Sequence, residues 1–406
     1  MRVTIERLGH LGDGIAAGPV YVPRALPGEV VEGEAQGDTL AAPKIVAAAP
    51  ERVAAPCPHY AACGGCALQH ATDDFVAGWK VGVVQAALAG QGISTLFRPI
   101  STSAPRSRRR AALAGRRTRK GVLVGFHGRA SETVVAVPDC RLLDTAILAA
   151  VPALEDIVAA GASRKGELTL TVTRAEGGPD VAVTGGKPLD GALQLALGRI
   201  AEARGLSRLT WDGETVALRV PPAQRFGAAR VVPPPGAFLQ ATDAGEAALL
   251  AAVTEAVGDA RRVADLFAGC GTFALPLSAR AEVHAVEGEA AMLAALDRGW
   301  RAATGLKRVT TEARDLFRRP LLPAELTGFD AVVIDPPRAG AEAQVAELAR
   351  AGVPVIAMVS CNPVTFARDA RRLVEAGYSL DWVQVVDQFR WSAHVEIASR
   401  FTRASR

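Results

Sequence analysis

The sequence lacks a hydrophobic run long enough to span a membrane, which takes about 20 residues. Hydrophobic residues make up 49% of the chain, but its alanine-rich apolar stretches are short and are broken by charged residues. The start of the chain, residues 1–7 (MRVTIER), alternates apolar with charged side chains and has no apolar run of the kind found in signal peptides. These absences exclude a membrane protein and predict one that stays in the cytoplasm.

Cysteine is scarce, and disulfides are not expected. The 406 residues include six cysteines, which a reducing compartment would keep as thiols or metal ligands. Cys57, Cys63 and Cys66 lie close together around two glycines, and Cys140 follows 74 residues later. Zinc sites usually consist of two CxxC pairs, whereas a clustered triad with a distant fourth cysteine is common for an iron–sulfur cluster. The spacing favours a metal centre over four unrelated buried cysteines.

The net charge is small, +4, but positive charge is concentrated in residues 106–120, which contain no acid. This density suits the neutralisation of phosphates, and the alternative is a solvated strand face. Because phosphate contacts position a nucleic acid without reading its sequence, the segment predicts RNA or DNA but no particular target. Its basic residues are Arg106, Arg108, Arg109, Arg110, Arg116, Arg117, Arg119 and Lys120.

The chain is too long for one ordinary core, and its pattern changes twice. Residues 1–50 contain short strands and frequent turn signals, which predict a small OB-like β-barrel. After a Pro/Ala-rich link, residues 51–235 mix a helix over 75–89 with strands over 122–126, 133–137 and 168–172, which indicates an α+β domain. The run of prolines at 233–235 then opens a third domain, 236–406, in which strand and helix alternate strictly to the end.

The third domain has the pattern of a doubly wound parallel sheet. Buried strands are predicted over 262–267, 282–287 and 330–335, and polar residues follow them where such sheets bind ligands. Gly269-x-Gly271-x-x-Ala274 allows a tight turn beside a cofactor, and Glu287 at the end of the next strand is placed for ribose hydroxyls. This motif alone fits a nicotinamide dinucleotide nearly as well as S-adenosylmethionine.

Other residues favour methyl transfer. Asp315 follows the third strand and is placed to accept from an adenine amino group, and Asp335 opens an Asp-Pro-Pro turn suited to a nucleobase substrate. Cys361 stands in a Ser-Cys-Asn-Pro turn, and Glu396 is a lone acid 35 residues later. A thiol and a carboxylate suit a methyltransferase whose target carbon cannot attack a methyl donor unaided, whereas hydride transfer has no evident use for the thiol.

These residues resemble the S-adenosylmethionine-dependent RNA uracil-5 methyltransferases over nearly the whole chain. Residues 1–50 are similar to the family's TRAM barrel, and the four cysteines match its [4Fe-4S] motif. The signatures are residues 238–240 (FLQ), 265–271 (DLFAGCG), 335–340 (DPPRAG) and 360–363 (SCNP). A barrel together with a cluster is most similar to the branch that methylates 23S ribosomal RNA.

The resemblance implies a Rossmann-like class I methyltransferase domain with Cys361 as nucleophile and Glu396 as general base. It also implies that Phe238 and Asp335 lie close to the target base. Two departures concern the shape of the substrate loops: Thr242 stands where asparagine is frequent, and Ser392-Ala393 where proline or glycine is frequent. The residues expected around the cofactor are Gln240, Phe267, Thr272, Glu287, Asp315 and Asp335, and those expected on the cluster are Cys57, Cys63, Cys66 and Cys140.

The expected substrate is therefore a uridine in 23S ribosomal RNA, with S-adenosylmethionine as the methyl donor. Transfer RNA is the alternative substrate, because the active-site residues do not distinguish the two. A different class of function, a non-catalytic RNA-binding protein on a decayed scaffold, would share the barrel and the arginines but would not need Cys361 and Glu396. No obligate protein partner is indicated.

Overall fold

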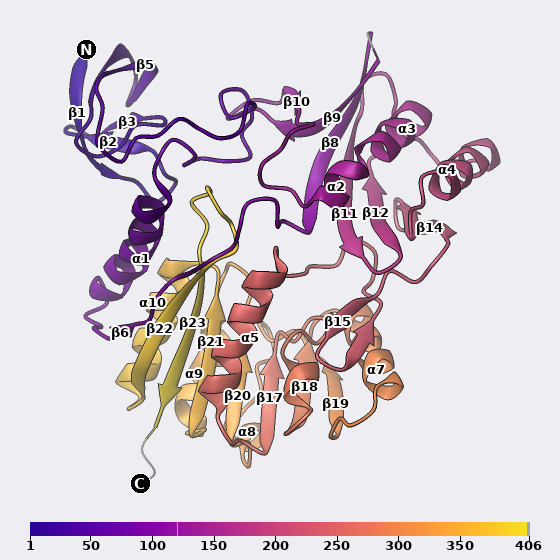
Figure 1. Cartoon of the computed structure of the whole chain (residues 1–406). Helices are drawn as coiled ribbons and strands as arrows, with labels where there is room; N and C mark the ends of the chain where they lie inside the picture. Colours follow the sequence, from indigo (N-terminus) through magenta and orange to yellow (C-terminus); the bar gives the residue numbers. More distant parts are fainter. Residues whose placement is uncertain (120, 404–406) are drawn as a thin grey trace.

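The computed structural model describes residues 1–119 and 121–403. Lys120, the last of the basic residues named above, lies outside the described residues. In Figure 1 a barrel (indigo) occupies the upper left, a seven-stranded sheet (magenta) the upper right, and a nine-stranded sheet the lower half. None of the described helices combines the length and the apolar character that crossing a membrane requires.

The first strands close into a barrel in the order β1-β2-β3-β5-β4. Its interior is filled by small and branched apolar side chains such as Ile5, Val22, Val31 and Leu40. The structure thus has a closed barrel where the sequence predicts one. The strands are β1 (Arg2–Leu8), β2 (Gly14–Ala16), β3 (Val20–Val22), β4 (Val30–Gln36) and β5 (Thr39–Ala47).

The central sheet has the order β10-β9-β8-β11-β12-β13-β14 and is antiparallel except between β12 and β13. Three helices pack on it: α2 (Thr145–Ala149), α3 (Val151–Gly161) and α4 (Gly191–Ala203). The expected α+β pattern is present. The strands are β8 (Arg110–Thr118), β9 (Gly121–His127), β10 (Val134–Ala136), β11 (Glu167–Ala175), β12 (Gly178–Thr184), β13 (Arg208–Trp211) and β14 (Glu214–Leu218).

The C-terminal sheet has the order β19-β18-β17-β20-β21-β23-β22-β6, and β7 also pairs with β22. Apolar cores lie on both of its faces. The hairpin of β15 (Gln224–Phe226) and β16 (Ala229–Val231) packs on α7. The strands are β17 (Arg262–Leu266), β18 (Glu282–Glu287), β19 (Val309–Ala313), β20 (Ala331–Ile334), β21 (Val355–Ser360), β22 (Ser379–Asp387) and β23 (Glu396–Thr402). The helices are α5 (Asp243–Val257), α6 (Ala274–Leu277), α7 (Ala290–Ala302), α8 (Pro323–Leu326), α9 (Glu342–Ala351) and α10 (Pro363–Glu375).

The sequence prediction of strict alternation fails after α10. β22 and β23 follow each other without a helix and pair antiparallel, and β23 also runs antiparallel to β21. A parallel neighbour needs a long crossover, whereas an antiparallel one needs only a short loop, and residues 388–395 form that loop. It rises toward the other two units (yellow in Figure 1).

A segment from the N-terminal side also joins the C-terminal sheet. α1 (Asp73–Ala89) packs on α10, and β6 (Leu96–Phe97) and β7 (Ser101–Thr102) pair with β22. These residues lie within the range 51–235 that the sequence assigns to the central domain. Sequence order groups them with their neighbours in the chain, but the apolar face of α1 is buried against the C-terminal sheet.

Candidate active site

One cavity collects the predicted residues of the third domain. It has a volume of ≈ 430 Å³ and lies beyond the carboxyl ends of β17, β18, β19, β20 and β21. All six residues expected at the cofactor line it, as do both residues expected to be catalytic: Gln240, Phe267, Thr272, Glu287, Asp315, Asp335, Cys361 and Glu396. Phe238 lines it as well. Its size falls in the ordinary range of small-molecule sites.

The loop after β17 forms one wall of the cavity. Gly269 and Gly271 have φ of 54° and 95°, and a Cβ on Gly271 would lie 2.9 Å from Leu275 and Leu296. Two backbone N–H groups, those of Gly269 and Glu289, each donate to an oxygen of the Glu287 carboxylate at 3.0 Å. The loop therefore needs glycine for both conformation and space, and it fixes Glu287 at the cavity wall.

The electrostatics of the cavity favour a cationic ligand. Glu287, Asp315, Asp335 and Glu396 are among its carboxylates, and Arg338 is the one basic side chain among the described residues that line it. Burial raises the pKa of Asp335 to about 7. The carboxylates of Glu287, Glu289 and Asp315 attract a sulfonium and an ammonium group and repel a pyrophosphate. The glycine motif alone fits both cofactors, and the acidic lining of the cavity favours S-adenosylmethionine over a dinucleotide.

Cys361 stands between the end of β21 and the first turn of α10. Asn362 caps that helix by accepting from the Val364 N–H at 3.0 Å, and its own amide donates to the Arg338 carbonyl at 3.0 Å. Burial, and then the nearby Glu396 and Asp335, raise the pKa of the Cys361 thiol to about 11, while Arg338 lowers it. The helix N-terminus and Arg338 favour the thiolate, but the thiol is protonated until a ligand changes this balance.

Glu396 is the first residue of β23 and is buried beside Asp335. Burial and the Asp335 charge raise its pKa well above the usual value, and a hydrogen bond with the Gln388 side chain opposes the rise. A carboxylate with a raised pKa can accept a proton at neutral pH, which suits a general base. Gln388 was not predicted from the sequence, because it belongs to no motif and stands at the end of a strand with mostly apolar residues.

Two exposed aromatic rings line the cavity. Phe238 and Phe317 are both exposed, and Phe317 packs against Phe267 with ring centroids 5.4 Å apart. One carboxylate oxygen of Asp315 accepts from the N–H groups of Phe317 and Arg318 at 3.0 and 3.3 Å. Exposed rings beside a polar cavity suit the stacking of a flat heterocycle. Phe317, like Gln388, belongs to no motif and was not predicted to line the site.

The four clustered cysteines meet at a second location. Cys57, Cys63, Cys66 and Cys140 line one small cavity, which also includes Tyr60 and Gln69. Burial raises the pKa of Cys66 to about 12 and also raises those of Cys63 and Cys140. Within residues 1–119 and 121–403, no three His, Cys, Asp or Glu side chains are arranged to hold one metal ion.

The cysteine segment contacts the loop that precedes Glu396. The N–H groups of Ala67 and Leu68 both donate to the carbonyl of Trp391, at 2.8 and 2.9 Å. The Trp391 side chain is buried in the same core as Cys63 and Cys140. The segment therefore supports the β22–β23 loop from outside the C-terminal sheet.

The arginine-rich segment does not form a single basic face. Arg109 is buried and pairs with Asp243 and Glu246 of α5, at 2.7 and 2.5 Å. Arg116 pairs with Glu167 at 2.5 Å. Arg106, Arg117 and Arg119 are exposed. The acids that pair with Arg109 and Arg116 come from distant positions in the chain, so the absence of acids within residues 106–120 does not mean that these arginines are unpaired. The phosphate-binding interpretation therefore holds at most for part of the segment.

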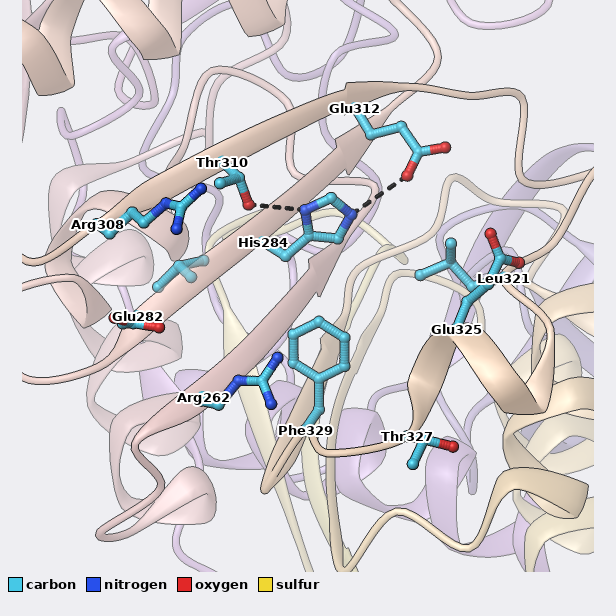
Figure 2. Close-up of a pocket in the computed structure, with 11 residues that line it drawn as sticks. Arg262, Glu282, His284, Arg308, Thr310, Glu312, Leu321, Glu325, Thr327 and Phe329 are labelled. Atoms are coloured by element: carbon cyan, nitrogen blue, oxygen red, sulfur yellow. Dashed lines mark hydrogen bonds and ion pairs between the residues drawn. The ribbon is translucent and has the colours of Figure 1, made fainter.

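Another cavity, of ≈ 330 Å³, lies beside β18 and β19 and contains none of the predicted site residues. Figure 2 shows His284 between Thr310 and Glu312, with hydrogen bonds of 2.9 and 3.2 Å. Arg314 joins Glu312 to Glu325, at 2.6 Å in each case. His284, Thr310, Glu312, Arg314 and Glu325 thus satisfy one another.

Comparison with known proteins gives consistent findings. A family model described as tRNA (Uracil-5-)-methyltransferase matches residues 300–403, which include Asp315, Asp335, Cys361 and Glu396. An uncharacterized RNA methyltransferase of Brucella suis biovar 1 (strain 1330) is 44% identical over 99% of this chain and 98% of its own length. The 23S rRNA (uracil(1939)-C(5))-methyltransferase RlmD of Halomonas elongata is 35% identical over 97% of this chain and 88% of its own length.

The fold also has a solved counterpart. The crystal structure of Pyrococcus abyssi tRNA (uracil-54, C5)-methyltransferase in complex with S-adenosyl-L-homocysteine superposes with a TM-score of 0.75 and covers 99% of both chains. The two sequences are 22% identical, so this likeness concerns the fold.

Proposed function

The chain belongs to the tRNA/rRNA uracil-5-methyltransferase family, and from this premise we propose that it methylates C5 of a uridine in 23S ribosomal RNA through a covalent adduct on Cys361. The observation that carries the proposal is the convergence of a thiol, a buried carboxylate and an acidic cofactor-sized cavity at one sheet edge. The choice of 23S RNA is supported by RlmD, a 35% identical relative over nearly the whole chain.

S-adenosylmethionine would supply the methyl group. The lining fits it, because Glu287 and Asp315 offer acceptors for ribose and adenine and the remaining carboxylates suit its cationic groups. Gln240, Phe267, Thr272 and Asp335 would complete the surroundings.

The chain's own groups then act on the uridine. Uracil C5 is a weak nucleophile, so Cys361 loses its thiol proton to solvent and the thiolate adds to C6, which makes C5 enolate-like. After C5 is methylated, Glu396 takes the C5 proton as general base. The electron pair of the broken C5–H bond forms the C5=C6 double bond, and the C6–S bond breaks to release Cys361. The uridine must leave its stack to reach the cavity, at a cost of a few kcal/mol, and Phe238 is placed to receive it.

We also propose that the N-terminal barrel is a TRAM domain that holds RNA and that the four cysteines bind a [4Fe-4S] cluster. In such a cluster each thiolate binds a different iron, so four thiols around one cavity fit it even though no three are placed to share one ion. Anaerobically purified protein should contain about four irons per chain, which Cys66→Ser should reduce and Cys270→Ser should not. One zinc per chain, or no iron, would contradict the cluster.

The experiment for the main proposal is incubation of the protein with labelled S-adenosylmethionine and total RNA that lacks 5-methyluridine. Ribosomal and transfer RNA are then separated and their nucleosides analysed. Labelled 5-methyluridine in 23S RNA, a cytoplasmic substrate, is the expected result. Label in transfer RNA would keep the chemistry and change the substrate, and no label in either RNA would favour a non-catalytic RNA-binding protein.

A further inference from the structure

Gln388 connects groups on both sides of the candidate site. It follows β22, and its side chain is 1% exposed. Its Nε2 donates to Gln240 Oε1 at 2.5 Å, and its Oε1 accepts from the Ala241 N–H at 2.7 Å. The same side chain lies near the Glu396 carboxylate, whose residue pairs with Val386 of β22, and it opposes the rise in the pKa of Glu396. One amide is thus bonded to a residue of the proposed cofactor cavity and lies beside the proposed base.

The orientation of this amide is fixed by a group that can only donate. Because the Ala241 N–H needs an acceptor, Gln388 Oε1 must face it, and Nε2 must face Gln240 Oε1 and Glu396. The Gln240 amide is then oriented in turn, with its Nε2 toward Asp335 Oδ2 at 3.4 Å. A side chain of similar size without an amide would leave these buried partners unpaired.

The backbone on both sides of Gln388 is also held. Lys80 of α1 is fully buried, and its Nζ lies 2.5 Å from Asp387 Oδ1 and 3.1 Å from the Phe389 carbonyl. The Phe389 N–H donates to the same carboxylate oxygen at 3.1 Å. On the opposite side, Gly245 of α5 leaves no spare room, since a Cβ there would lie 2.5 Å from Gln388 Cβ. The side chain is therefore locked in one place.

We propose that Gln388 is a positioning residue for the elimination step, holding the Glu396 carboxylate where it takes the C5 proton and orienting Gln240 beside Asp335. This inference rests on the proposed function. In that step the proton moves to Glu396, the electron pair forms C5=C6, and the C6–S bond breaks. Thiolate addition and methylation come earlier and do not use Glu396, so loss of Gln388 should slow elimination more than it slows these earlier steps.

The test is Gln388→Met in the full-length protein, because methionine keeps the volume and removes the amide. Gln384→Met is the matched control: Gln384 lies on β22, which Gln388 directly follows, and its amide donates to the Pro99 carbonyl outside the cavity. Single turnover with methyl-labelled S-adenosylmethionine and unmodified 23S RNA is followed in two ways. Denaturing gels detect labelled protein–RNA adduct, and nucleoside analysis detects released 5-methyluridine.

Gln388→Met should accumulate methylated adduct and release product on the order of 10- to 100-fold more slowly, while Gln384→Met behaves like wild type. If Gln388→Met does not fold, Gly245→Ala should give the same adduct by displacing the amide. Release at the wild-type rate without adduct would overturn the positioning role. A wild-type protein that forms neither adduct nor 5-methyluridine would instead overturn the proposed function, so the two failures are distinguishable.

Discussion

Two cavities in the same sheet differ in how their charged groups are satisfied. Beside β18 and β19, Arg314 pairs with both Glu312 and Glu325 and lowers the pKa of Glu325 to about 2. Beyond the strand ends, burial raises the pKa of Asp335 to about 7, and that of Glu396 rises as well. In the first cavity Arg314 and its two partners stabilise each other's charges. In the second, burial disfavours the charged form of both carboxyl groups, which is typical of groups placed for a ligand or a reaction.

The largest expected difference concerns the thiols. Cys361→Ala should reduce 5-methyluridine formation to background, because no other group can add to C6. Cys270→Ala is the matched control, since Cys270 also lines the cavity but is buried in the glycine loop, and it should keep most of the activity. Both are measured by label in isolated RNA nucleosides. Turnover in Cys361→Ala would contradict the assignment of this cavity, and not the one beside β18 and β19, as the active site.

Replacement of the base should stop the reaction at a later step. Glu396→Gln removes the proton acceptor but leaves the thiol, so methyl transfer should proceed once and leave RNA covalently attached to protein. A labelled band that survives denaturation on a gel measures this adduct. Rapid repeated turnover by Glu396→Gln would mean that another group takes the proton.

Asp335→Asn should stabilise the fold while it impairs catalysis. The folded state holds the Asp335 proton more tightly than the unfolded state, so wild-type stability falls as pH rises from about 4 to about 7 and is then constant. Asp335→Asn has no carboxyl group to titrate, so its free energy of unfolding should exceed that of wild type by a margin that grows by about 3 kcal/mol between pH 5 and pH 8. Denaturant unfolding at both pH values measures this margin. A margin that does not change with pH would show that the pKa of Asp335 is the same in the folded and unfolded states.

The smallest effect is expected at the other cavity. Glu325→Gln breaks a partly exposed pair with Arg314, so it should cost less than about 1 kcal/mol at neutral pH, less still in high salt. The contribution of the wild-type pair exists above pH about 4.5 and is lost as the pH falls through about 2. Methyl transfer should be unchanged. A large loss of activity here would contradict the division between the two cavities.

Much of the candidate site could be predicted because its residues are encoded by local patterns. The glycine loop, Asp335 and Cys361 each follow a buried strand, and parallel strands bring their ends to the same edge. These local patterns therefore predict which residues meet in the cavity. The barrel followed from short strands and turn signals in the same way.

What escaped prediction depends on contacts between distant segments. The sequence pattern of β22 and β23 does not distinguish an antiparallel pair from a further alternating strand and helix. The partners of Arg109 lie on α5, more than a hundred residues away in the chain. Gln388 is a single polar residue after a strand, and its importance follows only from the approach of Gln240 and Glu396. Lys80 reaches the same loop from α1.

The most direct test of the central claim is to map the covalent adduct formed with 5-fluorouridine-containing RNA and S-adenosylmethionine. In 5-fluorouridine a fluorine replaces the C5 hydrogen that Glu396 would remove. The base therefore has no proton to take, so elimination stops and the adduct is trapped. Mass spectrometry of the digested complex should find the nucleotide on the peptide that contains Cys361. A nucleotide on Cys270, or no adduct while ordinary RNA is still methylated, would contradict a mechanism through Cys361.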